Sequence, residues 1–123
     1  MNPYWVGFDF DGVLVEFPAP GEPYGRDIPD MVNLLRLLLD HGITVKIFSA
    51  RAGNPISKSI VQSWLNLRGL NIPITDTKDF SLVAIFDDLA ITSRAGTLLT
   101  PLPIVNTILS TLNFTISPIP PGK

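Results

Sequence analysis

Apolar segments alternate with amphipathic segments along most of this chain. The apolar runs at residues 4–10, 43–48, 72–75 and 82–86 have the length and composition of strands. Apolar residues at residues 29–41 and 55–68 recur at helical spacing. This alternation is typical of a parallel sheet that carries helices on both faces. We therefore expect an α/β fold with a three-layer, Rossmann-like parallel sheet.

Glycines and apolar stripes define the two predicted helices more closely. Gly42 and Gly69 follow the last helical positions, where glycine ends a helix readily. The only histidine, His41, is expected to serve the terminus of the first helix. The spacing also predicts the inner stripes, which consist of Leu34, Leu37, Leu38 and His41 in the first helix and Ile60, Trp64 and Leu67 in the second.

The composition is that of a compact globular protein. The 123 residues fit one domain, 46% of them are hydrophobic and only 16% are charged. The net charge of -2 disfavours nucleic acid as a partner. There is no cysteine, and the first residues lack the pattern of a secretion signal. We expect a single domain over residues 1–123 and a cytoplasmic location.

The C-terminal segment, residues 95–123, is apolar and rich in proline. No charged residue lies between Arg94 and Lys123, but prolines and asparagines interrupt the apolar run. The uninterrupted stretches are too short to cross a bilayer, so we expect no membrane span. We predict a helix at residues 104–112, and the apolar character of the segment suggests a homodimer contact.

The first predicted strand ends on two carboxylates. Asp9 and Asp11 are two residues apart, so their side chains point the same way from an extended backbone, and Gly12 then allows a sharp turn. Like charges held close repel each other and call for a cation. An all-oxygen site of this kind suits Mg²⁺. The alternative is an ordinary Asp-Gly turn after a core strand.

Polar residues also follow the other predicted strands. Ser49 and Arg51 follow the second strand, Asp87 and Asp88 follow the last one, and Lys78 lies just before it. Open parallel sheets bind ligands at the carboxyl ends of their strands. Carboxylates, a hydroxyl and an ammonium at one edge are what phosphoryl transfer requires.

The order of these motifs resembles the haloacid-dehalogenase-like (HAD-like) phosphohydrolase superfamily over residues 5–92. The most specific match is Phe8-Asp9-Phe10-Asp11-Gly12-Val13. The second motif fits Ile47-Phe48-Ser49-Ala50-Arg51, and the fourth fits Ala84-Ile85-Phe86-Asp87-Asp88. The third motif is a lone lysine, for which we take Lys78, with Lys58 as the alternative.

The resemblance implies a role for each acidic residue. Asp9 would be the nucleophile that forms an aspartyl-phosphate. Asp11 would be the general acid and then the general base, and its backbone carbonyl would bind the metal. Asp87 would complete the Mg²⁺ site with Asp9, while Asp88 would support that site or act as an alternative ligand.

The resemblance also implies phosphate-binding roles and a substrate class. Ser49 and Lys78 would hold the transferring phosphoryl group. Arg51 would either reach the substrate or have a solvated or helix-capping role. The chain has no room for a cap domain, which implies an open site for a bulky phosphorylated substrate or a site closed by another subunit. One departure is Leu89-Ala90, where small capless relatives often have Arg-Ala.

Other interpretations remain open. A phospho-accepting receiver domain uses similar residues, but it places its acidic pair on the first strand and its phosphorylated Asp on the third. A catalytically silent HAD-like scaffold that binds a partner fits the same motifs. A plain α/β fold would need several coincidences at strand ends. The sequence does not identify the substrate.

Overall fold

The computed structural model describes residues 3–88, 93–94, 97–98 and 102–110. The chain divides into two compact units, Met1–Asp88 and Leu89–Lys123, and each is described by itself. The expectation of one domain over residues 1–123 stays a prediction.

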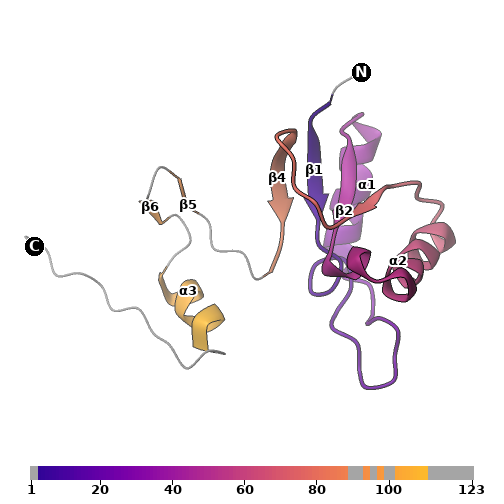
Figure 1. Cartoon of the computed structure of the whole chain (residues 1–123), viewed down its shortest axis with the longest axis horizontal. Helices are drawn as coiled ribbons and strands as arrows, with labels where there is room; N and C mark the ends of the chain where they lie inside the picture. Colours follow the sequence, from indigo (N-terminus) through magenta and orange to yellow (C-terminus); the bar gives the residue numbers. More distant parts are fainter. Residues whose placement is uncertain (1–2, 89–92, 95–96, 99–101, 111–123) are drawn as a thin grey trace, which may run out of the picture. The chain divides into compact units, whose positions relative to one another are not determined.

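The first unit is built on a parallel four-stranded sheet (Figure 1). Its strands are β1 (Trp5–Phe8), β2 (Val45–Phe48), β3 (Ile74–Thr75) and β4 (Leu82–Phe86), in the order β3-β2-β1-β4. All three strand pairs are parallel. The predicted α/β class and parallel sheet are thus confirmed. β1 is shorter than predicted, and both Asp9 and Asp11 lie beyond its end.

Two helices accompany the sheet, α1 (Pro29–Asp40) and α2 (Pro55–Leu67), and a short 3-10 helix, η1 (Ala50–Gly53), precedes α2. The Asn54 side chain caps α2, since its Oδ1 accepts hydrogen bonds from the backbone N–H groups of Ile56 and Ser57. Gly42 and Gly69 have φ angles of +76° and +66°, which confirms that these glycines end the helices. His41 Nδ1 lies 2.8 Å from the Leu37 carbonyl oxygen, so this histidine serves the helix terminus as expected.

The inner stripes of both helices agree with the prediction only in part: Trp64 is buried and Leu34 and Leu38 pack against the core, but other predicted positions are exposed. Leu37 is 52% exposed and Leu67 is 77% exposed. Both helices are apolar on more than one side, so spacing alone does not decide which stripe packs on the sheet. The buried residues are Val32 and Leu35 in α1 and Val61, Trp64 and Leu65 in α2.

One face of the sheet carries the main core. Phe8 of β1 and Val45 and Ile47 of β2 belong to the same buried cluster as the inner residues of both helices. Side chains alternate between the two faces of a strand, so α1 and α2 cover the same face.

The opposite face of the sheet carries Trp5 and Lys46. Trp5 is buried there, and the Lys46 Nζ lies 4.6 Å from its ring centroid. The Trp5 Nε1 donates to Asp79 Oδ1 at 2.9 Å. In residues 3–88 no helix connects β3 to β4. The connection, residues 76–81, is too short for the usual crossover helix. The expected third layer, with helices on both faces, is therefore not confirmed.

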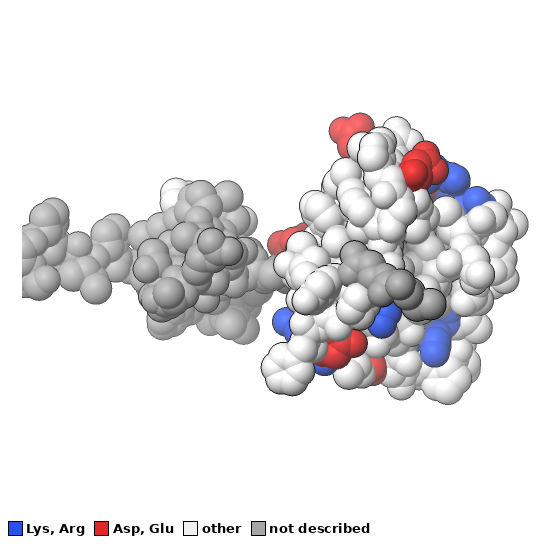
Figure 2. Space-filling model, turned by 90° about the horizontal axis from the view of Figure 1, so that it is seen from above, with Lys and Arg blue, Asp and Glu red and all other residues white. Residues whose placement is uncertain are grey.

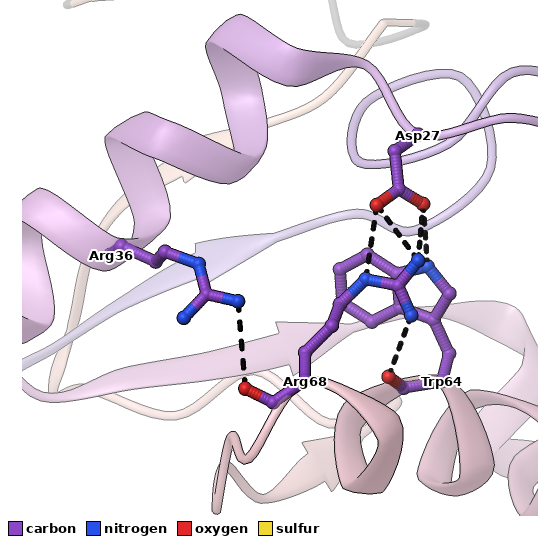
Figure 3. Close-up of polar contacts among 4 residues, drawn as sticks. All are labelled: Asp27, Arg36, Trp64 and Arg68. Atoms are coloured by element: carbon purple, nitrogen blue, oxygen red, sulfur yellow. Dashed lines mark hydrogen bonds and ion pairs between the residues drawn. The ribbon is translucent and has the colours of Figure 1, made fainter.

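A partly buried polar clamp, formed by Asp27, Trp64 and Arg68, joins the loop before α1 to α2 (Figure 3). The Asp27 carboxylate accepts a hydrogen bond from Trp64 Nε1 at 3.0 Å and from Arg68 Nη2 at 2.6 Å. The Arg68 guanidinium also lies over the Trp64 ring, 4.0 Å from its centroid. The clamp satisfies the indole N–H of a tryptophan that is fully buried.

Replacement of Asp27 by alanine is expected to destabilise the fold. Asp27→Ala leaves the buried indole N–H without its partner, which costs about 2 kcal/mol of unfolding free energy. Urea denaturation measures this loss. The matched control is Glu16→Ala, because the Glu16–Arg26 pair is 54% and 89% exposed and such pairs contribute about 0.5 kcal/mol or less. Equal losses in the two variants would contradict the role of the clamp.

The second unit contains β5 (Ser93–Arg94), β6 (Thr97–Leu98) and α3 (Leu102–Leu109). β5 and β6 pair antiparallel. The helix predicted at 104–112 is present as α3, but residues 111 and 112 lie outside the described residues, as does Leu89-Ala90. Within the described residues, no helix combines the length and the apolar character that a membrane crossing requires. The homodimer contact and the cytoplasmic location stay predictions.

Candidate metal and phosphoryl-transfer site

Three carboxylates meet where β1 and β4 end. The two strands are neighbours, with Phe8 opposite Phe86, and the Asp9 N–H donates to the Phe86 carbonyl at 2.9 Å. This register places Asp9 beside the residues that follow β4. One carboxylate oxygen from each of Asp9, Asp87 and Asp88 lies within 4.8 Å of the others. Residues far apart in the sequence thus form one acidic cluster.

Burial and the neighbouring carboxylates make ionisation of Asp9 less favourable than in water. Burial of its carboxyl group, together with repulsion from Asp87, Asp88 and Asp11, raises the pKa of Asp9 from 3.8 to about 6. A hydrogen bond of 2.7 Å from the Phe10 N–H to Asp9 Oδ1 works in the opposite direction. A bound cation would relieve the repulsion. Three close carboxylates are hard oxygen ligands, so this donor set fits Mg²⁺.

Gly12 lets the β1 loop turn tightly against this cluster. Its φ angle is +85°, a conformation that favours glycine, and its N–H donates to the Val15 carbonyl at 2.7 Å. A Cβ atom at this position would overlap the Asp88 carboxylate. The glycine therefore lets Asp88 lie directly against the loop.

Replacement of Gly12 by alanine is expected to weaken binding of Mg²⁺. The new methyl group displaces Asp88, so Gly12→Ala should lower Mg²⁺ affinity at least about tenfold, the lower end of what loss of a supporting group costs. Gly21→Ala is a matched control, because Gly21 has a φ angle of +84° with open space around its Cβ position. Calorimetric titration of both variants separates backbone strain from displacement of Asp88. Similar Mg²⁺ affinities in the two variants would count against the site.

Asp11 does not join the acidic cluster through its side chain. Its Oδ2 accepts a hydrogen bond from Arg51 Nε at 2.7 Å, and its Oδ1 accepts one from Arg51 Nη2 at 2.8 Å. The hydrogen bond to Asp11 raises the pKa of Arg51 above its ordinary value. The expected metal ligand at this position is the backbone carbonyl of Asp11, and that expectation stays a prediction.

Ser49 lies at the end of β2, the strand next to β1. It is buried, and its Oγ accepts a hydrogen bond from the Arg51 N–H at 3.2 Å, which caps η1. Its own N–H donates to the Thr75 carbonyl at 2.9 Å. Ser49 thus fixes the start of the segment that carries Arg51, and its phosphate-binding role stays a prediction.

The two candidate lysines lie in different places. Lys78 is in the connection from β3 to β4, and its Nζ lies 5.8 Å from the Phe48 ring centroid. Lys58 is exposed on α2, where it lines a surface hollow with other residues of that helix. Neither Lys78 nor Lys58 is joined to the acidic cluster by these contacts. The choice between the two lysines therefore stays open.

A hollow beside the cluster includes residues that the sequence did not single out. It has a volume of about 290 Å³ and is lined by Val13, Met31 and Phe86 next to Asp87 and Asp88. Met31 comes from the first turn of α1, whose packing on the sheet is a tertiary contact without a local sequence signal. Asp87 and Asp88 thus border a hollow whose other lining is mainly apolar.

Charge on the surface is dispersed. On the face of the Met1–Asp88 unit shown in Figure 2, Lys and Arg side chains are scattered and lie among Asp and Glu side chains. That face carries no continuous basic patch. The expectation that nucleic acid is disfavoured stays a prediction.

Comparison of the chain with protein-family models, curated proteins and solved structures gave no match in any of the three.

Proposed function

We propose that this protein is a Mg²⁺-dependent phosphomonoester hydrolase of the HAD-like type. The observation that carries the proposal is the meeting of Asp9, Asp87 and Asp88 within 4.8 Å at the ends of β1 and β4. The resemblance of the strand-end motifs to HAD-like phosphohydrolases supplies the reaction class.

The proposed reaction has two steps and uses two carboxylates. Asp9 attacks phosphorus, the bond to the leaving oxygen breaks, and Asp11 donates a proton to that oxygen. Asp11 then takes a proton from water, which attacks the aspartyl-phosphate and releases inorganic phosphate and free Asp9. This covalent route divides one difficult displacement into two easier ones.

Binding and charge neutralisation complete the proposal. Asp9 and Asp87 would hold Mg²⁺, with Asp88 in support, and the ion would supply positive charge to the phosphoryl oxygens. Ser49 and a lysine, Lys78 in our assignment, hold the phosphoryl group. The absence of room for a cap domain favours a bulky phosphorylated substrate.

The first experiment compares hydrolysis of p-nitrophenyl phosphate with Mg²⁺ and with a chelator. We expect turnover with Mg²⁺ and its loss on chelation, with recovery when Mg²⁺ is added back. A silent scaffold would bind Mg²⁺ without turnover, and a receiver would lose its own phosphate without hydrolysing an ester. A panel of phosphorylated metabolites then identifies the substrate class.

A further inference from the structure

Arg51 makes three directed hydrogen bonds on one side of the candidate site. Two go to the two carboxylate oxygens of Asp11, as described above. The third runs from Nη2 to the Pro23 carbonyl at 3.0 Å. Pro23 belongs to the loop of residues 16–26, so one guanidinium joins this loop to the candidate acid–base residue.

The pair formed by Arg51 and Asp11 is shielded and oriented. Their side chains are only 16% and 23% exposed, and the two-point contact fixes the plane of the carboxylate relative to the guanidinium. A solvated surface pair would have neither property. The side of Arg51 that carries these bonds is occupied, so it is not free for a substrate in this arrangement.

Arg51 also contacts the hydrophobic core. Its guanidinium carbon lies 5.3 Å from the Phe10 ring centroid. Phe10 is fully buried and packs edge-on against Trp64 and Tyr24, with ring centroids 5.4 and 6.1 Å apart. The Ser49 cap fixes the backbone of Arg51. The position of Asp11 is therefore set by the hydrophobic core through Phe10 and Arg51.

From these contacts we propose that Arg51 is a positioning residue that aims the Asp11 carboxyl group and ties its orientation to the loop of residues 16–26. The inference rests on the proposed function, because Asp11 must have a proton-transfer role for its orientation to matter. Arg51 binds both carboxyl oxygens. Each oxygen that accepts one hydrogen bond from Arg51 keeps a second lone pair, so one oxygen can exchange a proton with the substrate while the other stays bonded to Arg51.

Leaving-group dependence tests this role. An alkyl phosphate needs a proton on its leaving oxygen, whereas p-nitrophenolate leaves as a stable anion. For Arg51→Met, kcat/KM should fall roughly 100-fold or more with an alkyl phosphate and less than about tenfold with p-nitrophenyl phosphate, with KM little changed. Arg51→Lys, which keeps the charge but not the two-point contact, should fall in between.

A double mutant tests whether Arg51 acts through Asp11. Asp11→Asn should show the same leaving-group pattern, and adding Arg51→Met to it should cause little further loss. Arg26→Met is the control, because it removes an exposed arginine of the same loop, and it should leave the kinetics unchanged. Equal losses with both esters, or additive losses in the double mutant, would overturn the proposal.

Hydrogen exchange gives a readout without catalysis. In Arg51→Met, but not in Arg26→Met, the amides of residues 21, 22, 24 and 25 should exchange faster, because the Pro23 carbonyl loses its donor. If exchange at these amides is unchanged in Arg51→Met, the proposal that Arg51 holds the loop of residues 16–26 is wrong. If the unmodified protein hydrolyses neither ester, the proposed function fails together with the catalytic role of Arg51, and exchange still decides whether Arg51 holds the loop.

Discussion

Asp9→Asn is expected to abolish phosphatase activity, with a loss of at least about 10³-fold in kcat. The side chain loses the charged oxygen that attacks phosphorus, so no aspartyl-phosphate forms. Steady-state hydrolysis of p-nitrophenyl phosphate measures the loss, and mass spectrometry of the quenched enzyme detects the phosphorylated intermediate, expected in the unmodified protein and absent from the variant.

Two controls separate loss of chemistry from loss of folding. Asp40→Asn changes an exposed carboxylate at the end of α1, away from the cluster, and should keep full activity. Asp9→Asn itself should melt at an equal or higher temperature than the unmodified protein at pH 7 without Mg²⁺, because it removes a charge that burial and its neighbours disfavour. Activity that survives in Asp9→Asn would reject the proposed nucleophile.

Mg²⁺ affinity is expected to fall about tenfold between pH 7 and pH 5, because the metal binds the ionised carboxylate and protons compete for it. The raised pKa of Asp9, about 6 without a cation, places this competition in that interval. Calorimetric titration with Mg²⁺ at several pH values measures the effect. Asp9→Asn should bind Mg²⁺ more weakly and lose most of this pH dependence, and a constant affinity in the unmodified protein would contradict the assignment.

The same raised pKa predicts how stability varies with pH. In the absence of metal, Asp9 favours the folded state most when protonated. Its contribution is fully present below its ordinary pKa of 3.8 and is lost as the pH rises through about 6. Because Mg²⁺ binds the folded state, it should raise the melting temperature more at pH 7 than at pH 5. An equal rise in melting temperature on addition of Mg²⁺ at pH 5 and at pH 7 would contradict this linkage.

Local signals predicted most of the first unit. The strand β4 spans the predicted residues, α1 begins at Pro29, and Gly42 and Gly69 end the helices because a positive φ angle favours glycine. The stripe of α1 was predicted only in part, with Leu34 and Leu38 packed against the core but Leu37 exposed, because several faces of that helix are apolar. Helices on both faces of the sheet could have been doubted from the sequence, because residues 76–81 between β3 and β4 leave no room for a crossover helix.

The closeness of Asp9 to Asp87 and Asp88 could be predicted from the sequence, but the pairing of Arg51 with Asp11 could not. The strand-end rule indicated that Asp9 and the Asp87-Asp88 pair would be close, since parallel strands end at the same edge. The neighbouring strands β1 and β2 bring Asp11 and Arg51 to the same edge of the sheet, but no local pattern specifies that their side chains pair. The clamp between Asp27 and Arg68 depends on tertiary packing in the same way.

The most direct test of the metal site is a crystal structure grown with Mn²⁺, which takes the same oxygen ligands as Mg²⁺ and has a strong anomalous signal. The account predicts one ion within about 2.5 Å of a carboxylate oxygen of both Asp9 and Asp87, with Asp88 beside them. An ion bound elsewhere, or Asp9 and Asp87 turned away from each other at saturating Mn²⁺, would contradict it.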